Sequence, residues 1–118
     1  VRFKELSDRS SPEGEASAAI RERVIGAREI QRERFREAGI FSNAQMPSKL
    51  IRRHCPLDSE SEKLLESAMT RLGLSARAYD RILKVSRTAA DLDGASDIGA
   101  SHVAEAVGYR SLDRTYWT

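Results

Sequence analysis

One arginine of this sequence stands where a protein can bind an anion. Within the segment LSARAYDR, Ser75 is a good helix N-cap, which places Arg77 in the first turn of the helix that follows. Unpaired backbone N–H groups and the helix dipole make that end positive, so a cation there is unfavourable unless a negative group joins it. Asp80, three residues later, could be that group, and a phosphate could be another. Because exposed arginines are common, chemistry alone favours a solvated Arg77 paired with Asp80 over a phosphate sensor.

The other chemically active side chains are too few to form a site. The chain contains only two histidines, His54 and His102, and one cysteine, Cys55. These residues cannot supply a structural zinc site, a Ser/His/Asp set or a Cys/His set. A Walker A sequence, GxxxxGK(S/T), is also absent from the sequence. We therefore expect no catalytic residue and no metal ligand in this chain.

Arg77 would be positioned by the stretch with the clearest helical period. Its apolar residues recur at steps of four, three, four and three, which is the spacing of one helical face. The pattern predicts a helix from Ala76 to about Asp93, with Gly73 closing the helix before it and Gly94 as its own stop. The expected stripe consists of Ala78, Ile82, Val85, Ala89 and Leu92, widened by Tyr79, Leu83 and Ala90.

The longest helical candidate lies earlier, over residues 15–38, with Gly39 as a plausible stop. Arg21, Arg28 and Arg32 fall on one of its faces, and glutamates are interleaved with them. A solvated, salt-bridged face is the favoured interpretation. The alternative is an arginine face turned toward a nucleotide, a neighbouring subunit or nucleic acid. The inward stripe is expected to contain Ile20, Val24, Ala27 and Gln31, with Ile30 and Phe35 beside it.

Three shorter helices are expected around these two. The first begins at Pro47, a residue type suited to the first helical position, and ends at about His54. The second begins after Asp58, which has the right side chain for an N-cap. The third opens at residue 100 or 101, after a loop whose apolar anchor is Ile98. In the core that these helices form, we expect Ile82 and Val85 among the most buried residues, with Leu65 and Ile20 packing nearby.

Length and composition agree with one helical domain. The chain has 118 residues, of which 40% are hydrophobic and 32% charged. The formal net charge of +2 argues against a strongly basic nucleic-acid module. No apolar run approaches the roughly 20 residues that span a membrane, and the N-terminus has no signal-peptide pattern. The sequence predicts a soluble all-α fold of about five helices over residues 15–118, after an extended lead-in and linker over residues 1–14.

Four blocks, in this order, carry a resemblance to a known family: GEASAAIRERVIGAREIQRERF, NAQM, LGLSARAYDRILKVSRTAADL and SHVAEAVGYRSLDR. Together they resemble the C-terminal end of magnesium-chelatase-like AAA+ ATPases, and most closely the competence ComM branch of that family. The resemblance extends from about residue 1 to residue 114. It implies a lid-type helical bundle that follows an α/β nucleotide-binding core, with residues 1–14 leading out of that missing core.

The resemblance also implies a role for Arg77. Within LSARAYDR, Arg77 matches the sensor-2 arginine, which in such ATPases reaches the γ-phosphate of ATP, and Ser75 caps the helix beside it. This match reverses the preference that chemistry alone gives and favours a functional Arg77. The Walker A, Walker B and arginine-finger residues of the family have no counterpart here. The chain alone is therefore expected neither to hydrolyse ATP nor to bind it tightly.

For the full-length parent, the resemblance implies a cytoplasmic ring motor, commonly hexameric, that binds ATP and Mg. Its partners would be the missing AAA+ core, neighbouring subunits and DNA, since the ComM branch performs DNA branch migration in natural transformation. The alternative within the family is the lid of a magnesium-chelatase subunit that drives metal insertion into a porphyrin. Two further alternatives are a stand-alone helical interaction module and a DNA-binding domain. The latter would use Arg21, Arg28, Arg32, Arg52 and Arg53.

Overall fold

The computed structural model describes the backbone of residues 12–117 and the side chains of residues 16–109. Over this range the fold is helical and contains no strand, apart from an isolated parallel bridge between Leu57 and Ile98. The all-α prediction is therefore confirmed for the described residues. The part of the expected lead-in that covers residues 1–11 lies outside them. The elements are α2 (Pro12–Arg34), η1 (Asn43–Gln45), α3 (Ser48–His54), α4 (Ser59–Leu72), α5 (Ala76–Leu92) and α6 (Ala100–Trp117).

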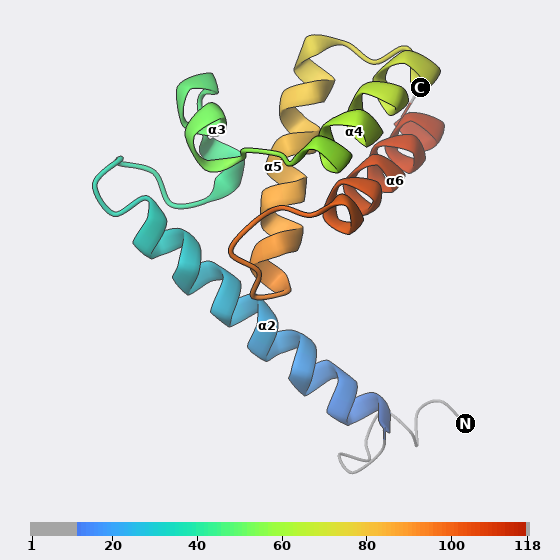
Figure 1. The fold of residues 1–118 in the computed structure, drawn as a ribbon. Coiled ribbons are helices and arrows are strands. Elements are labelled where there is room, and N and C mark those ends of the chain that lie inside the picture. The colour runs from blue at the N-terminus through green and yellow to red at the C-terminus, as the bar shows by residue number, and fades with distance from the viewer. Residues whose placement is uncertain (1–11, 118) are drawn as a thin grey trace.

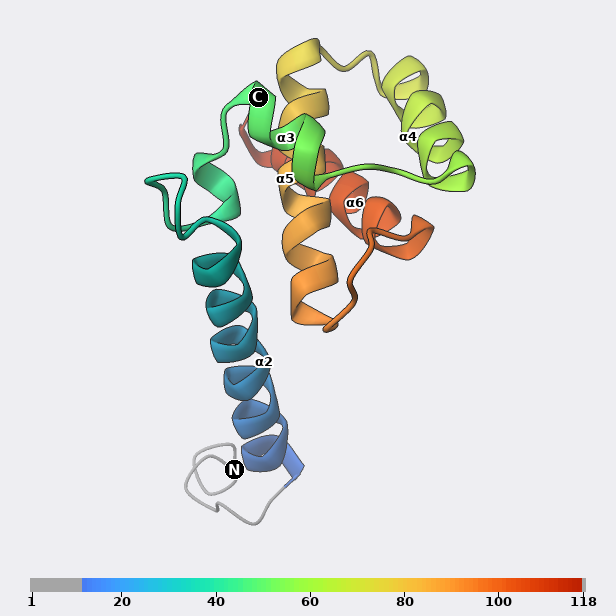
Figure 2. The ribbon, with the colours of Figure 1, turned by 60° about the vertical axis from the view of Figure 1, so that its left-hand side comes forward.

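Helix α5 lies at the centre of the fold (Figure 1). It packs against α2, α3, α6 and η1, and α4 packs against α6. Figures 1 and 2 both show the N-terminal half of α2 projecting away from the other helices. In both views the start of α5 lies at the end of the bundle remote from this projection. The projecting half of α2 and the start of α5 therefore lie at opposite ends of the fold.

The core forms where α5 meets its neighbours. Ile82 exposes 1% of its surface and Leu65 exposes 0%, as predicted. The core also draws on the connections between helices, because Met46 and Ile98 are buried in the same cluster. The buried members of this cluster are Phe35, Met46, Ile51, Cys55, Leu65, Ile82, Leu83, Ala90, Ile98, Val103 and Ala106.

Two residues expected in the core are exposed. Val85 exposes 37% of its surface, because the buried arc of α5 is rotated toward Leu83 and Ser86 and leaves Val85 at its edge. The buried Ser86 hydroxyl has a hydrogen-bond partner, since its Oγ donates a hydrogen bond of 2.8 Å to the carbonyl of Ile82. Ile20 exposes 50% of its surface, because it lies in the projecting half of α2. The placement of Val85 and Ile20 in the core was therefore wrong, and so was that of Ile30 beside the inward stripe, since Ile30 exposes 39% of its surface.

The residues that flank α5 act as expected. The Oγ of Ser75 accepts a hydrogen bond of 3.2 Å from the backbone N–H of Ala78, which satisfies one of the free donors of the first turn. Gly73 ends α4 in the left-handed region, at φ +62°. Asp58 caps α4 by accepting a hydrogen bond of 2.7 Å from the N–H of Ser61. These local signals fix where α5 begins and therefore where Arg77 lies.

The bounds of α2 differ from the sequence prediction at both ends. The helix begins at Pro12, a residue type favoured in the first turn because its missing N–H is not needed there. Residues 12–14, expected in the linker, are therefore helical. The helix ends at Arg34, four residues before the predicted end at Ala38. Phe35 turns into the core at that point, and the chain then reverses through turns up to Gly39, at φ +77°.

Among the described helices, none has both the length and the apolar character needed to cross a membrane.

Candidate anion site at the start of α5

Arg77 is exposed in the first turn of α5. Within the described part of the chain it forms no ion pair and no hydrogen bond, and the Arg77–Asp80 pair of the plainer interpretation is not formed. The helix has no acidic residue in its first turn to offset this cation. The Arg77 guanidinium is thus free to meet an external anion at the positive end of the helix dipole.

A hollow of about 610 Å³ lies beside Arg77. One wall comes from α5 and the other from the segment that joins η1 to α3 together with the first turn of α3. The α5 wall carries three cations and one carboxylate, which leaves a net charge of +2. A hollow with this charge attracts an anion and repels a divalent cation. The lining residues are Met46, Pro47, Ser48, Ile51, Arg77, Asp80, Arg81 and Lys84.

The wall opposite α5 is held in place by the NAQM segment. Lys84 of α5 donates a hydrogen bond of 3.0 Å to the carbonyl of Ala44. The Gln45 side chain accepts hydrogen bonds from the backbone N–H groups of Phe41 and Ser42, at 2.7 and 3.2 Å, which closes the turn around η1. Met46 is buried in the core below the hollow. The NAQM segment therefore has a structural role, which is to shape one side of the hollow.

A buried ionic cluster joins the far end of α5 to α2. The Asp91 carboxylate has no exposed side-chain surface, and Arg34 forms two hydrogen bonds to it, of 2.8 and 2.7 Å. Arg87 approaches the same carboxylate at 3.2 Å and also donates to the carbonyls of Ala95 and Ser96. We call Arg34, Arg87 and Asp91 the ionic cluster. Two cations on one buried carboxylate tie α2 to α5 in a fixed geometry.

Asn43 completes this connection. Its amide Nδ2 donates to Asp91 at 2.9 Å and to Thr88 at 3.0 Å, and its Oδ1 accepts from Arg34 at 2.9 Å. Its backbone N–H donates to the side chain of Gln31 at 3.0 Å. Sequence reasoning placed Gln31 on the inward stripe of α2 but missed Asn43 and Asp91. The available signal was that a polar residue on an inward stripe needs buried polar partners.

The basic residues of α2 and α3 lie elsewhere. Arg21, Arg28 and Arg32 are exposed and form no ion pairs with described side chains, so the expected salt-bridged face is not seen. Arg52 and Arg53 are also exposed. None of the five lines the hollow beside Arg77, but Arg52 lines an adjoining hollow that shares Ser48, Ile51 and Asp80 with it.

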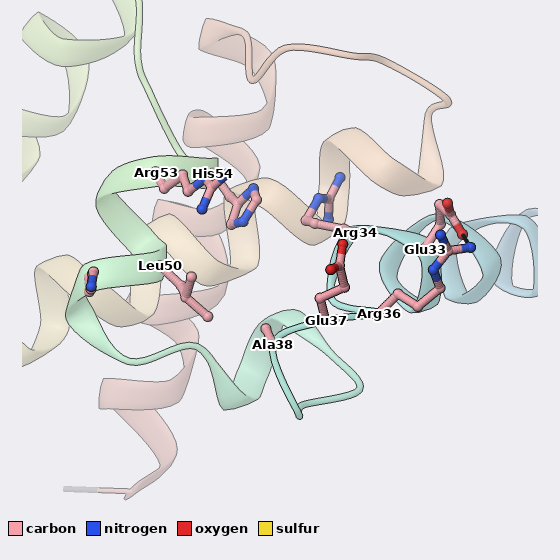
Figure 3. Close-up of a pocket in the computed structure, with 9 residues that line it drawn as sticks. Glu33, Arg34, Arg36, Glu37, Ala38, Leu50, Arg53 and His54 are labelled. Atoms are coloured by element: carbon pink, nitrogen blue, oxygen red, sulfur yellow. Dashed lines mark ion pairs between the residues drawn. The ribbon is translucent and has the colours of Figure 1, made fainter.

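A second hollow of about 580 Å³ separates the end of α2 from α3 (Figure 3). Its charges are mixed, since Glu33 pairs with Arg36 at 3.5 Å and Glu37 lies on the same side. Burial lowers the pKa of His54 at its wall, and the nearby cations, with Arg34 first, lower it further. Its four cations, Arg34, Arg36, Lys49 and Arg53, outnumber the two glutamates, so its net charge is also +2. What distinguishes the hollow beside Arg77 is its position at the start of a long helix, whereas this one lies beside the C-terminal end of α2, where the dipole disfavours anions.

The described residues offer no metal site. No group of three His, Cys, Asp or Glu side chains among them is placed to hold an ion. Burial raises the pKa of the Cys55 thiol to about 11, so this thiol stays protonated and unreactive at neutral pH. His102 is held by structural contacts, since its Nε2 lies 2.8 Å from Asp93 and its Nδ1 accepts from the N–H of Gly99.

Comparison with known proteins places the chain in a family. Residues 14–110 match the family model described as magnesium chelatase, subunit ChlI C-terminal. The chain is 54% identical over 101 residues to competence protein ComM of Haemophilus influenzae and 46% identical over 101 residues to the protein YifB of Escherichia coli. It is 37% identical over 101 residues to the protein Rv2897c of Mycobacterium tuberculosis.

Each of these three matches covers 86% of this chain but only 19 or 20% of the relative. The chain thus spans about a fifth of the length of these curated relatives. The family model covers most of the chain, including all of α3, α4 and α5 and with them the hollow beside Arg77. This chain belongs to the family of magnesium chelatase ChlI C-terminal domains.

Proposed function

We propose that this domain is the lid of an AAA+ ATPase and that Arg77 is its sensor-2 arginine. In this proposal Arg77 contacts the γ-phosphate of ATP held by a core elsewhere in a longer protein. The observation that carries the proposal is the free Arg77 guanidinium at the positive end of α5, facing a hollow with net positive charge. Two findings support the proposal: the chain belongs to the magnesium chelatase family, and it covers only about a fifth of the length of each relative.

The chemistry of the site follows from its charges. A γ-phosphate at the start of α5 meets the guanidinium fork of Arg77 and the free N–H groups of the first turn. As the phosphoryl group is transferred, negative charge moves among its oxygens, and a fixed guanidinium stabilises that charge without reorganisation. Mg²⁺ does not fit this hollow, because three of its four charged side chains are cationic. The ion that accompanies ATP therefore belongs with the core in this proposal.

The ionic cluster gives the lid a means to transmit motion. Arg34 and Asp91 fix α2 to α5, so a displacement of α5 toward a bound phosphate carries α2 with it. Closure of the lid on ATP and its release after hydrolysis would then move the projecting half of α2. In a ring of subunits, for which we propose the hexamer common in this superfamily, such a projection can reach a neighbour.

For the parent protein we propose a cytoplasmic motor that migrates DNA branches during natural transformation. The support is the 54% identity to a protein named for competence. The alternative, metal insertion into a porphyrin, rests on the description of the family as a magnesium chelatase subunit. A branch-migration assay on a four-way DNA junction separates the two, since only a DNA motor separates its arms in an ATP-dependent way.

Nucleotide binding by the parent protein tests the sensor role of Arg77. The wild type should bind a non-hydrolysable ATP analogue more tightly than ADP, because only the former carries the γ-phosphate. Arg77→Ala should lower this preference by about tenfold, the usual range for a hydrogen bond to a charged group. Arg71→Ala, which removes an exposed arginine outside the hollow, is the matched control and should leave the preference unchanged. An undiminished preference in Arg77→Ala would rule out the sensor role.

A further inference from the structure

The hollow beside Arg77 contains a second exposed arginine. Arg81 lies one helical turn after Arg77 and lines the same hollow. Within the described part of the chain it forms neither an ion pair nor a hydrogen bond. Residues four apart lie on one face of a helix, and their Cα atoms are separated by about 6 Å along the axis. Two free guanidinium groups therefore face the hollow side by side.

The charges around Arg81 are unfavourable in the absence of an anion. Its neighbours at spacings of three and four along α5 are Arg77, Ala78, Lys84 and Val85, which include two cations and no acid. Like charges at these spacings destabilise a helix. Asp80 is the one carboxylate of the lining, and it pairs with neither arginine. The helix thus carries a row of three cations that its own side chains do not neutralise.

The opposite wall of the hollow adds no negative charge. It consists of Met46, Pro47, Ser48 and Ile51, whose side chains are apolar or neutral. Lys84 differs from the two arginines, because its ammonium group already donates to the carbonyl of Ala44. The cations that remain free for a ligand are therefore Arg77 and Arg81. The volume of the hollow, about 610 Å³, lies within the range of small-molecule binding sites.

We propose that Arg81 binds the phosphate chain of the same nucleotide whose terminal phosphate meets Arg77. This inference rests on the proposed function of the lid and adds a second binding residue to it. An extended polyphosphate can bind two guanidinium groups that lie one helical turn apart, since it presents anionic oxygens to both at once. Arg81 lies a turn farther from the helix end, so it contacts phosphate whose charge changes little during transfer. Arg81 therefore increases the affinity for the nucleotide, whereas Arg77 stabilises the transition state of phosphoryl transfer.

The test is steady-state ATP hydrolysis by the parent protein carrying Arg81→Ala, Arg81→Lys or the control Arg71→Ala. Arg81→Ala should raise KM for ATP by about tenfold, as expected for the loss of a charged hydrogen bond, and should change kcat less than about twofold. Arg81→Lys should restore part of the affinity, since it keeps the charge and loses the planar fork. The control should behave as the wild type, because Arg71 lies outside the hollow.

A melt of the 118-residue chain separates binding from structure. Arg81→Ala removes a like-charge contact, so its melting temperature should equal or slightly exceed that of the wild type. Unchanged KM in Arg81→Ala, or a melting temperature lower by many degrees, would overturn the role of Arg81. If Arg77→Ala still changes nucleotide binding in that case, the proposed function survives and only the second arginine is refuted. If neither variant changes binding or turnover, the proposed function fails as well.

Discussion

Near the end of α5, one buried carboxylate serves two arginines from different parts of the chain. Asp91 binds Arg34, which is 57 residues away in sequence, and Arg87, which is four residues away. A carboxylate without exposed surface is tolerated only if it is paired and hydrogen-bonded, and Asn43 and the two arginines meet that condition. Removing it would leave the buried Arg87 and the largely buried Arg34 without a counter-ion. The ionic cluster is therefore the polar arrangement on which the packing of α2 depends most.

Substitution of Asp91 measures this dependence. Asp91→Asn keeps the shape of the side chain but removes its charge, and should lower the free energy of unfolding by about 3–5 kcal/mol, the cost of breaking a buried pair. The control is Asp97→Asn at an exposed carboxylate without an ion pair, which should change stability by less than about 0.5 kcal/mol. Denaturant unfolding of the chain at neutral pH gives both values. A loss below about 1 kcal/mol for Asp91→Asn would show that the cluster is not a structural tie.

The structural role of some single residues could be predicted from the sequence, and that of others could not. Ser75, Gly73 and Asp58 were predicted correctly, because a helix cap depends on a few neighbouring residues. Asn43 and Asp91 were not, because their partners come from distant segments and no periodicity marks them. Arg81 was read only as part of a helix, since its meaning depends on the hollow formed with the segment after η1.

At the level of helices, α5 shows which features the sequence determines. Its start was predicted correctly and its end to within a residue, and its stripe was correct for Ala78, Ile82 and Ala89. The exposure of Val85 was missed because the centre of a buried arc depends on which helices pack on each side. Here α6, α3 and η1 cover a broad arc of α5, and that arc extends to the polar residue Arg87.

The rotation of the buried arc can be tested with two truncations on the same helix. Ile82→Ala should lower the free energy of unfolding by about 2–5 kcal/mol, because it opens a cavity in the packed core. Val85→Ala removes two methyl groups at the edge of the arc and should cost no more than about 0.5 kcal/mol. Both substitutions replace a β-branched residue of α5 by alanine, so they change the helix propensity by similar amounts. Equal losses for the two would mean that the arc is centred as the sequence pattern suggested.

On the scale of the whole molecule, the fold places two features at opposite ends. The start of α5 and the segment after η1 form a cationic hollow at one end of the bundle. The projecting half of α2 lies at the other end, and the ionic cluster joins the two helices in between. The helical class and the special position of Arg77 could be predicted from sequence, because both follow from local patterns. The hollow and the connection to α2 could not, since they arise only when distant segments meet.

The central claim is that Arg77 acts on the transferring phosphate and not on the fold. Its guanidinium gains nothing from a side-chain partner in the described part of the chain, so truncation should barely affect stability. Arg77→Ala should therefore shift the melting temperature of the chain by no more than about 3 °C. Arg77→Lys should keep the charge and lose the bidentate geometry, and should behave as an intermediate in turnover.

The most direct measurement is the rate of ATP hydrolysis by the parent protein at saturating ATP, for the wild type and for Arg77→Ala, with melts of the chain alongside. The account predicts that turnover falls by about 100-fold, as when one preorganised charge donor is removed from a transition state, while the chain stays folded. Unchanged turnover, or an Arg77→Ala chain that melts many degrees lower, would contradict the account and make Arg77 a structural residue.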